Sequence, residues 1–118
     1  MNERESLNVV DDQVGCPTYA ADLASAIMQI VASGKAFANA GVYHYSNQGV
    51  ISWCEFAQAI KELSGSKCVV NPVPSSAYPT PAKRPSYSVM DTQKIQQVFD
   101  IAIPQWKDSL AKCIALLK

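Results

Sequence analysis

The sequence predicts an α/β protein with few strands and several amphipathic helices. Short β-prone runs alternate along the 118 residues with longer segments whose apolar residues recur at helical spacing. The expected order is strand, helix, strand, helix, strand, loop, helix, helix. Parallel strands joined through helices are normally covered on both faces, so a chain with so few strands should have unpaired edges. This pattern favours either a part of a larger fold or an oligomer.

The first elements follow a polar start, and residues 1–7 are expected to be frayed. A β-prone run at Leu7–Val10 predicts a strand. Thr18 is the expected N-cap of a helix from Tyr19 to Val31. The apolar stripe of this helix follows the spacing i, i+4, i+7, i+8 and consists of Leu23, Ile27, Ile30 and Val31.

The middle of the chain contains a strong helix signal. Val42–Ser46 alternates between two faces and predicts a strand, which the turn residues Asn47–Gly49 should end. Ser52 and Glu55 then form a capping-box pattern, in which each side chain satisfies a backbone donor of the other residue. A helix is expected to begin there and to end at Gly65, which suits a left-handed C-terminal position.

The segment after this helix is rich in proline. Val69–Val73 predicts a short strand at a sheet edge, because Pro72 cannot donate a hydrogen bond to a ladder. Residues 74–85 should be extended and semi-rigid rather than helical.

Two helices are expected at the end of the chain. Asp91 can cap a short helix that ends at Phe99, and Pro104 suits the first position of a C-terminal helix. The apolar stripe of that last helix consists of Trp106, Leu110, Ile114 and Leu117.

Composition excludes several classes of function. Ten basic and ten acidic residues cancel, so no positive excess exists to drive nucleic-acid binding. With 48% apolar and 17% charged residues the chain can bury a core, but its apolar runs are too short to span a membrane and no signal peptide opens it. We therefore expect a cytoplasmic protein. Its cysteines could form disulfides if it were secreted, but reduced thiols fit the missing signal peptide better.

Motifs for catalysis, cofactor binding and metal binding are missing from the sequence. No Gly-x-Gly-x-x-Gly turn is present to hold a dinucleotide pyrophosphate. The single histidine, His44, lies within a predicted strand, and the scattered cysteines form no Cys-x-x-Cys pair, so neither a catalytic triad nor a zinc site is expected. Asp11 and Asp12 are adjacent and should point to opposite faces.

Arg84 is the strongest candidate for a ligand contact. Its guanidinium offers forked donors that suit a diphosphate, and Pro85 stiffens the backbone behind it. The alternatives are stacking on a tyrosine or pairing with a surface carboxylate, and the residues alone leave both open. Trp53 could stack on a base or a sugar, or could serve only in packing. Hydroxyl groups that could contact a ligand, or act only as cap or turn residues, belong to Thr18, Tyr78, Thr80 and Ser88.

Several ordered motifs together resemble one enzyme family. They are Val-Val-Asp-Asp-Gln-x-Gly-x-Pro-Thr at 9–18, Gly-Val-Tyr-His at 41–44, Ser-Trp-Cys-Glu-Phe-Ala at 52–57, Tyr-Pro-Thr-Pro-Ala-Lys-Arg-Pro at 78–85 and Pro-x-Trp at 104–106. In this order they resemble the C-terminal part of dTDP-4-dehydrorhamnose reductases, which are extended short-chain dehydrogenase/reductases. The resemblance implies that residues 1–118 form the C-terminal substrate-binding region of that fold, with the Rossmann half missing.

The resemblance also assigns expected roles. Arg84 is implied as the diphosphate contact, with Gln13, Thr18, Tyr78 and Thr80 lining the substrate pocket. NADPH would be bound by the missing N-terminal half, and no tyrosine here is followed four residues later by the lysine that the family uses in catalysis. The family's intersubunit magnesium is not implied, because the last ten residues contain no acidic side chain.

The implied function is binding of the sugar nucleotide in a reductase that converts dTDP-4-dehydro-L-rhamnose into dTDP-L-rhamnose for surface polysaccharide. This chain alone should be inactive. The alternative is a non-catalytic regulatory or interaction module of the same fold, like the regulatory subunits of methionine adenosyltransferase. Expected partners are the dTDP-sugar, the missing N-terminal half and, through exposed apolar surface, further copies of the chain.

Overall fold

The strand pair at the start of the fold is parallel and joins two distant parts of the chain. In the computed structural model, which describes residues 5–77 and 80–117, β1 (Ser6–Val10) pairs with β4 (Val69–Val73), with Ser6 opposite Val69 and Val10 opposite Val73. The strand predicted at Val69–Val73 is confirmed. Among the described residues, β1 and β4 pair only with each other, so each has an open edge and Pro72 is tolerated there.

The expectation that residues 1–7 are frayed is wrong for Ser6 and Leu7. Both lie in β1, where Leu7 is opposite Val70. The backbone carbonyl of Glu5 also accepts a hydrogen bond from the Val69 amide at 2.8 Å. Ladder pairing with a strand that is far away in sequence orders these residues despite their polar composition.

The capping box at the start of α2 (Trp53–Ser64) is confirmed. The Glu55 amide donates to Ser52 Oγ at 3.1 Å, and the Ser52 amide donates to Glu55 Oε1 at 3.3 Å. Just before the helix, β3 (Ile51–Ser52) pairs antiparallel with β2 (Val14–Gly15). The helix ends at Gly65, as expected, and packs on β1 and β4.

The helix α1 (Ala20–Ser33) forms as predicted, but its N-cap is Tyr19 instead of Thr18, and no side chain caps it. The Tyr19 amide instead donates to Asn47 Oδ1 at 2.7 Å, so a tertiary contact replaces the local cap. The apolar stripe is only partly covered, since Ile27 and Val31 are 51% and 65% exposed.

No strand forms at Val42–Ser46, so that prediction is wrong. The two-faced alternation is present, since Tyr43 and Tyr45 pack on the core cluster while Val42 and His44 are exposed. However, no partner strand lies beside this segment among the described residues. The core cluster of the α1 end is formed by Ala26, Ile95, Phe99 and Ile101. A strand pattern without a neighbouring strand cannot form a ladder.

Asn47–Gly49 does not form the predicted turn. Asn47 is 2% exposed, and Gln48 forms a parallel bridge with Gln105. A short 3₁₀ helix, η1, covers Phe37–Asn39, and a second one, η2, covers Ser75–Ala77, where an extended chain was expected.

The last two helices are confirmed with shifted starts. The N-cap of α3 (Gln93–Phe99) is Thr92, although Asp91 still accepts a hydrogen bond from the Gln93 amide at 2.9 Å. The helix α4 (Trp106–Leu117) begins after Pro104, and Leu110 on its stripe is buried. Leu117, also expected in that stripe, is 78% exposed.

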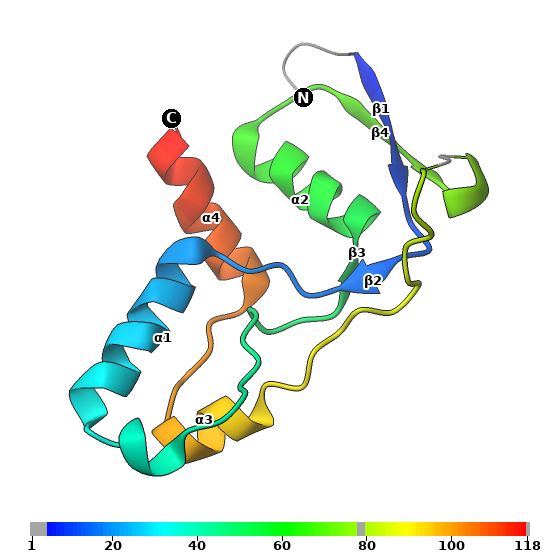
Figure 1. Ribbon diagram of the computed structural model, residues 1–118. Helices are drawn as coiled ribbons and strands as arrows, with labels where there is room; N and C mark the ends of the chain where they lie inside the picture. Colours follow the sequence, from blue (N-terminus) through cyan, green and yellow to red (C-terminus); the bar gives the residue numbers. More distant parts are fainter. Residues whose placement is uncertain (1–4, 78–79, 118) are drawn as a thin grey trace.

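The elements are spread over a flat, elongated molecule with principal extents of 51 × 34 × 20 Å. Figure 1 shows β1, β4 and α2 at one end, α1 and α3 at the other, and α4 beside α2. Within the residues that the structure describes, no helix combines the length and apolar character needed to cross a bilayer. The four cysteines are free thiols. The mixed α/β class expected from the sequence is confirmed.

Gly49 has a φ of 118°, and its backbone lies close to the Trp106 side chain. A Cβ built there would lie 2.3 Å from Trp106 Cδ1. We predict that Gly49→Ala lowers the free energy of unfolding by more than about 2 kcal/mol, because it adds both backbone strain and a steric clash. Gly65→Ala is the matched control, since Gly65 also has a positive φ but open space around it. Urea denaturation of both variants checks this, and equal losses would contradict the role assigned to the clash.

Candidate functional site

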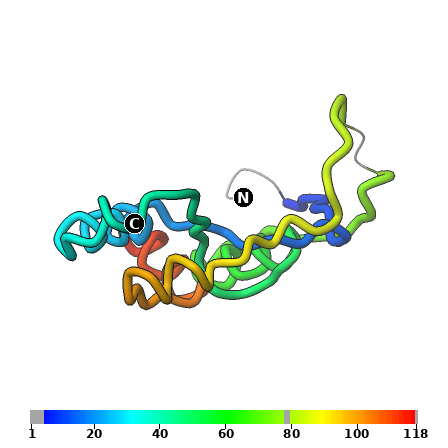
Figure 2. Tube along the Cα trace, turned by 60° about the horizontal axis from the view of Figure 1, so that its bottom comes forward, coloured from blue at the N-terminus to red at the C-terminus, as the bar shows by residue number. Residues whose placement is uncertain are grey.

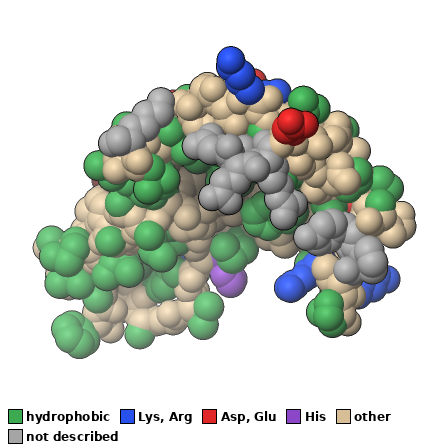
Figure 3. Space-filling view, turned by 90° about the horizontal axis from the view of Figure 1, so that it is seen from above, with side chains coloured by type: hydrophobic (Ala, Val, Ile, Leu, Met, Phe, Trp, Pro, Cys, Tyr) green, Lys and Arg blue, Asp and Glu red, His purple; other side chains and the backbone are tan. Residues whose placement is uncertain are grey.

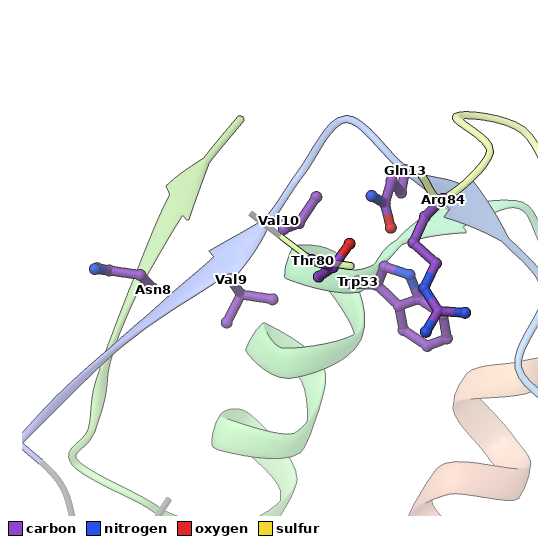
Figure 4. Close-up of a pocket in the computed structure, with 7 residues that line it drawn as sticks. All are labelled: Asn8, Val9, Val10, Gln13, Trp53, Thr80 and Arg84. Atoms are coloured by element: carbon purple, nitrogen blue, oxygen red, sulfur yellow. The ribbon is translucent and has the colours of Figure 1, made fainter. Parts of the chain in front are cut away.

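A cavity of about 400 Å³ opens beside the carboxyl end of β1 and the first turn of α2. Figure 4 shows the side chains that line it, which come from β1, the loop after it, α2 and the segment after residue 79. The lining residues are Asn8, Val9, Val10, Gln13, Trp53, Thr80 and Arg84. The cavity therefore combines an apolar floor with a few polar groups, as ligand pockets commonly do.

Three of the five predicted site residues, Gln13, Thr80 and Arg84, lie together in this cavity. Figure 4 shows their side chains gathered around Trp53. Backbone hydrogen bonds hold the two contributing segments against each other, since the Val14 amide donates to the Ser86 carbonyl at 2.9 Å. The structure thus brings together residues that are far apart in sequence.

Arg84 is exposed, and its guanidinium donors have no partner in the described part of the chain. Within residues 5–77 and 80–117 it forms no ion pair, hydrogen bond or ring contact. The alternatives of a tyrosine stack or a carboxylate partner are therefore not found in the described part of the chain. An unpaired guanidinium beside a cavity suits an anionic ligand, because its forked donors match the oxygens of phosphate groups.

A second cavity of about 440 Å³ shares Gln13, Thr80 and Arg84 with the first. It also touches Ser75 and Ser76 in η2, which follows β4. Since Arg84 borders both spaces, an extended ligand could place its charged group at Arg84 and one part in each cavity.

A fourth predicted site residue, Thr18, does not line the cavities that Arg84 borders. Thr18 is exposed and borders a separate cavity of about 90 Å³ together with Tyr19, Asn47 and Trp106. Tyr78 lies outside the described residues.

No site role was predicted for the strand residues Asn8, Val9 and Val10, and both packing and ligand stacking were open for Trp53. Its packing role is observed, since its ring is 6.5 Å from that of Phe56 in an edge-to-face arrangement. Trp53 is also 53% exposed and lines the cavity, so part of its surface remains open to a ligand. The strand residues carried no signal of their own, because a β-prone run looks the same whether or not a cavity borders it.

The side chains that line the cavity offer hydrogen-bonding groups, one positive charge and an aromatic ring. Among the described residues, no group of three or more His, Cys, Asp and Glu side chains is placed to hold a metal ion. Cys54 follows Trp53 in α2, and burial raises the pKa of its thiol, with the charges of Asp11 and Glu55 adding to the effect. This thiol therefore stays protonated near neutral pH and is a poor nucleophile.

Asp12 lies beside the second cavity's Ser75. Its Oδ2 accepts hydrogen bonds from the Ser75 amide at 3.0 Å and from the Ser75 hydroxyl at 2.9 Å. These bonds, the one from the amide first, lower the pKa of Asp12, because they stabilise the charged carboxylate.

Known proteins match the chain over its whole length. A family model described as the RmlD substrate binding domain matches residues 1–118. Among curated relatives, the dTDP-4-dehydrorhamnose reductase of Sinorhizobium fredii is 35% identical over 117 residues, which is 93% of this chain and 40% of the relative. That of Aggregatibacter actinomycetemcomitans is 39% identical over 116 residues, covering 91% and 39%.

Solved structures give the same picture. A dTDP-4-dehydrorhamnose reductase from Clostridium acetobutylicum superposes with a TM-score of 0.87 at 35% identity, over 98% of this chain and 40% of that one. The enzyme from Bacillus anthracis, solved in complex with NADP, gives a TM-score of 0.86 at 34% identity, over 98% and 39%. The chain spans about 40% of the length of the relatives that it matches.

The hydrogen bonds to Asp12 predict a measurable titration. We expect Ser75→Ala to raise the pKa of Asp12 toward its ordinary value while leaving it partly lowered, since the backbone amide remains as a donor. Because the folded pKa is depressed, the stabilisation is present above the unfolded pKa and is lost as the pH falls through the folded pKa. NMR titration of the Asp12 carboxyl carbon checks this, and an unchanged pKa would show that the hydroxyl bond is not formed in solution.

Proposed function

Because the chain belongs to the RmlD substrate-binding domain family, we propose that it forms the dTDP-sugar-binding part of a dTDP-4-dehydrorhamnose reductase. The observation that carries this proposal is the cavity in which Arg84, which has no partner among the described residues, lies together with Gln13 and Thr80. The parent enzyme would transfer hydride from NADPH to the C4 ketone of dTDP-4-dehydro-L-rhamnose.

Each cavity residue has a role suited to its chemistry. Arg84 donates to the diphosphate, the strongest charge that the ligand carries. Gln13 and Thr80 supply an amide and a hydroxyl to sugar or phosphate oxygens. The exposed face of Trp53 offers a surface on which a base or sugar ring can stack. Together these groups orient the substrate and contribute no acid or base to the reaction.

Cofactor binding and catalysis belong, in this proposal, to chain beyond these 118 residues. The sequence has neither the glycine-rich turn nor the Tyr-x-x-x-Lys pattern, and the relatives are longer. That a solved relative from Bacillus anthracis holds NADP supports a cofactor site in the longer proteins.

The exposed apolar face of α1 suits packing against a large partner surface. Ile27, Met28 and Val31 are 51%, 65% and 65% exposed and lie along one stripe, and Asp22 is the helix's single charged residue. Figure 3 shows hydrophobic side chains gathered at the end of the molecule where α1 lies, on the left. A helix that is apolar on nearly all sides is normally buried. In the parent this face would pack on the cofactor-binding half, and without that half it would drive copies of the chain together.

The role of Arg84 is tested by calorimetric titration with dTDP-L-rhamnose. We expect Arg84→Ala to weaken binding by about 1.5–3 kcal/mol, the value of a charge-assisted hydrogen bond. Lys112→Ala is the matched control, since it removes the same charge from the exposed side of α4, away from the cavity. Equal losses in both variants, or no binding by the unsubstituted chain, would contradict the proposal.

The apolar stripe is tested by light scattering at micromolar concentration. The unsubstituted chain should form oligomers, and Met28→Glu should shift it toward the monomer by placing a charge in the stripe. Gln29→Glu adds the same charge on the opposite side of α1 and should change little. A clean monomer of the unsubstituted chain would refute self-association through this face.

A further inference from the structure

The segment that carries Thr80 and Arg84 is attached at both ends to residues 11–14. At its start, the Asp11 amide donates to the Val73 carbonyl at 3.0 Å. At its end, the Val14 amide donates to the Ser86 carbonyl, and the Ser88 amide donates back to the Val14 carbonyl, both at 2.9 Å. The same four residues also contribute Gln13 to the cavity, so the two walls of the site share one support.

Apolar packing does little to hold this segment. Residues 74–77 and 80–88 are exposed throughout. Figure 2 shows the yellow-green part of this segment projecting from the body of the molecule. Without burial, the position of such a segment depends on the few hydrogen bonds at its ends.

The side-chain attachment at the start of the segment is made by Asp12. Its Oδ2 accepts from both the amide and the hydroxyl of Ser75, the first residue of η2. The single turn of η2 is closed by the Ala77 amide, which donates to the Pro74 carbonyl at 3.0 Å. Asp12 thus acts on η2 as an N-cap does, although it comes from a different part of the chain.

We propose that Asp12 is a positioning residue for substrate binding: by holding Ser75 it sets the start of the segment that places Arg84 opposite Gln13. The carboxylate does not touch the ligand. It lines neither cavity at Arg84, and its negative charge would repel a diphosphate. This inference rests on the proposed function, since it concerns the affinity of the same site.

The experiment is a double-mutant cycle on the full chain, titrated with dTDP-L-rhamnose. We expect Asp12→Asn to weaken binding about three- to tenfold and Ser75→Ala about two- to threefold, because charge-assisted hydrogen bonds are lost. In the Arg84→Ala background, Asp12→Asn should cost almost nothing more, because its effect passes through Arg84.

Asp11→Asn is the matched control. It removes the same charge one residue away, and within the described residues the Asp11 side chain forms no hydrogen bond with Ser75 or the segment. Binding by this variant should be unchanged. Equal weakening by Asp11→Asn and Asp12→Asn, or additive effects of Asp12→Asn and Arg84→Ala, would overturn the proposal.

A measurement without ligand separates this inference from the proposed function. Asp12→Asn should shift the NMR resonances of the Thr80 amide and the Arg84 side chain, while Asp11→Asn should leave them in place. If the chain binds no dTDP-sugar but these shifts occur, the function is wrong and the positioning by Asp12 stands. If the chain binds and Asp12→Asn moves neither resonance, the positioning role is wrong.

Discussion

The arrangement of the molecule depends on the buried side-chain amide of Asn47, which joins α1, Pro104 and α4 through hydrogen bonds. Its Oδ1 accepts from the Tyr19 amide at the start of α1, and its Nδ2 donates to Asp22 at 2.8 Å, to the Pro104 carbonyl at 3.2 Å and to Ser109 at 3.1 Å. Ser109 in turn donates to Asp22. Asn47 and Ser109 are 2% and 1% exposed. A buried polar group is costly unless it is paired, so this network favours the observed arrangement of α1, α4 and the segment around Asn47.

This hydrogen-bond network also helps to position the candidate site, because the backbone that follows Asn47 leads directly to it. Next to Asn47, Gln48 donates its amide to the Pro104 carbonyl at 3.0 Å and accepts from the Trp106 amide at 2.9 Å. The next residue, Gly49, lies close to the Trp106 side chain. β3 and the capping box follow along the chain and place Trp53 at the cavity. Among the described residues no buried side-chain nitrogen or oxygen lacks a partner. The site thus rests on a paired polar centre, while the described residues of the segment with Arg84 are exposed and the segment is attached by hydrogen bonds at its ends.

Local signals in the sequence were predictive where the stabilising contacts are themselves local. The capping box of Ser52 and Glu55 spans a single turn and was recognised for that reason. The strand expected at Val42–Ser46 failed because a strand needs a neighbour, which local alternation does not report. Asn47 looked like a turn residue, and Asp12 like a surface acid, since each acts on residues far away in sequence. For the same reason a family resemblance was needed to link the residues of the cavity.

The proposed function requires that a nucleoside diphosphate bind at the Arg84 cavity. The most direct test is to follow the backbone and side-chain NMR signals of the chain during a titration with dTDP. We predict shifts concentrated at Gln13, Thr80, Arg84 and the indole N–H of Trp53, which all line that cavity. Shifts confined to the separate cavity at Thr18, or no shifts at millimolar dTDP, would contradict it.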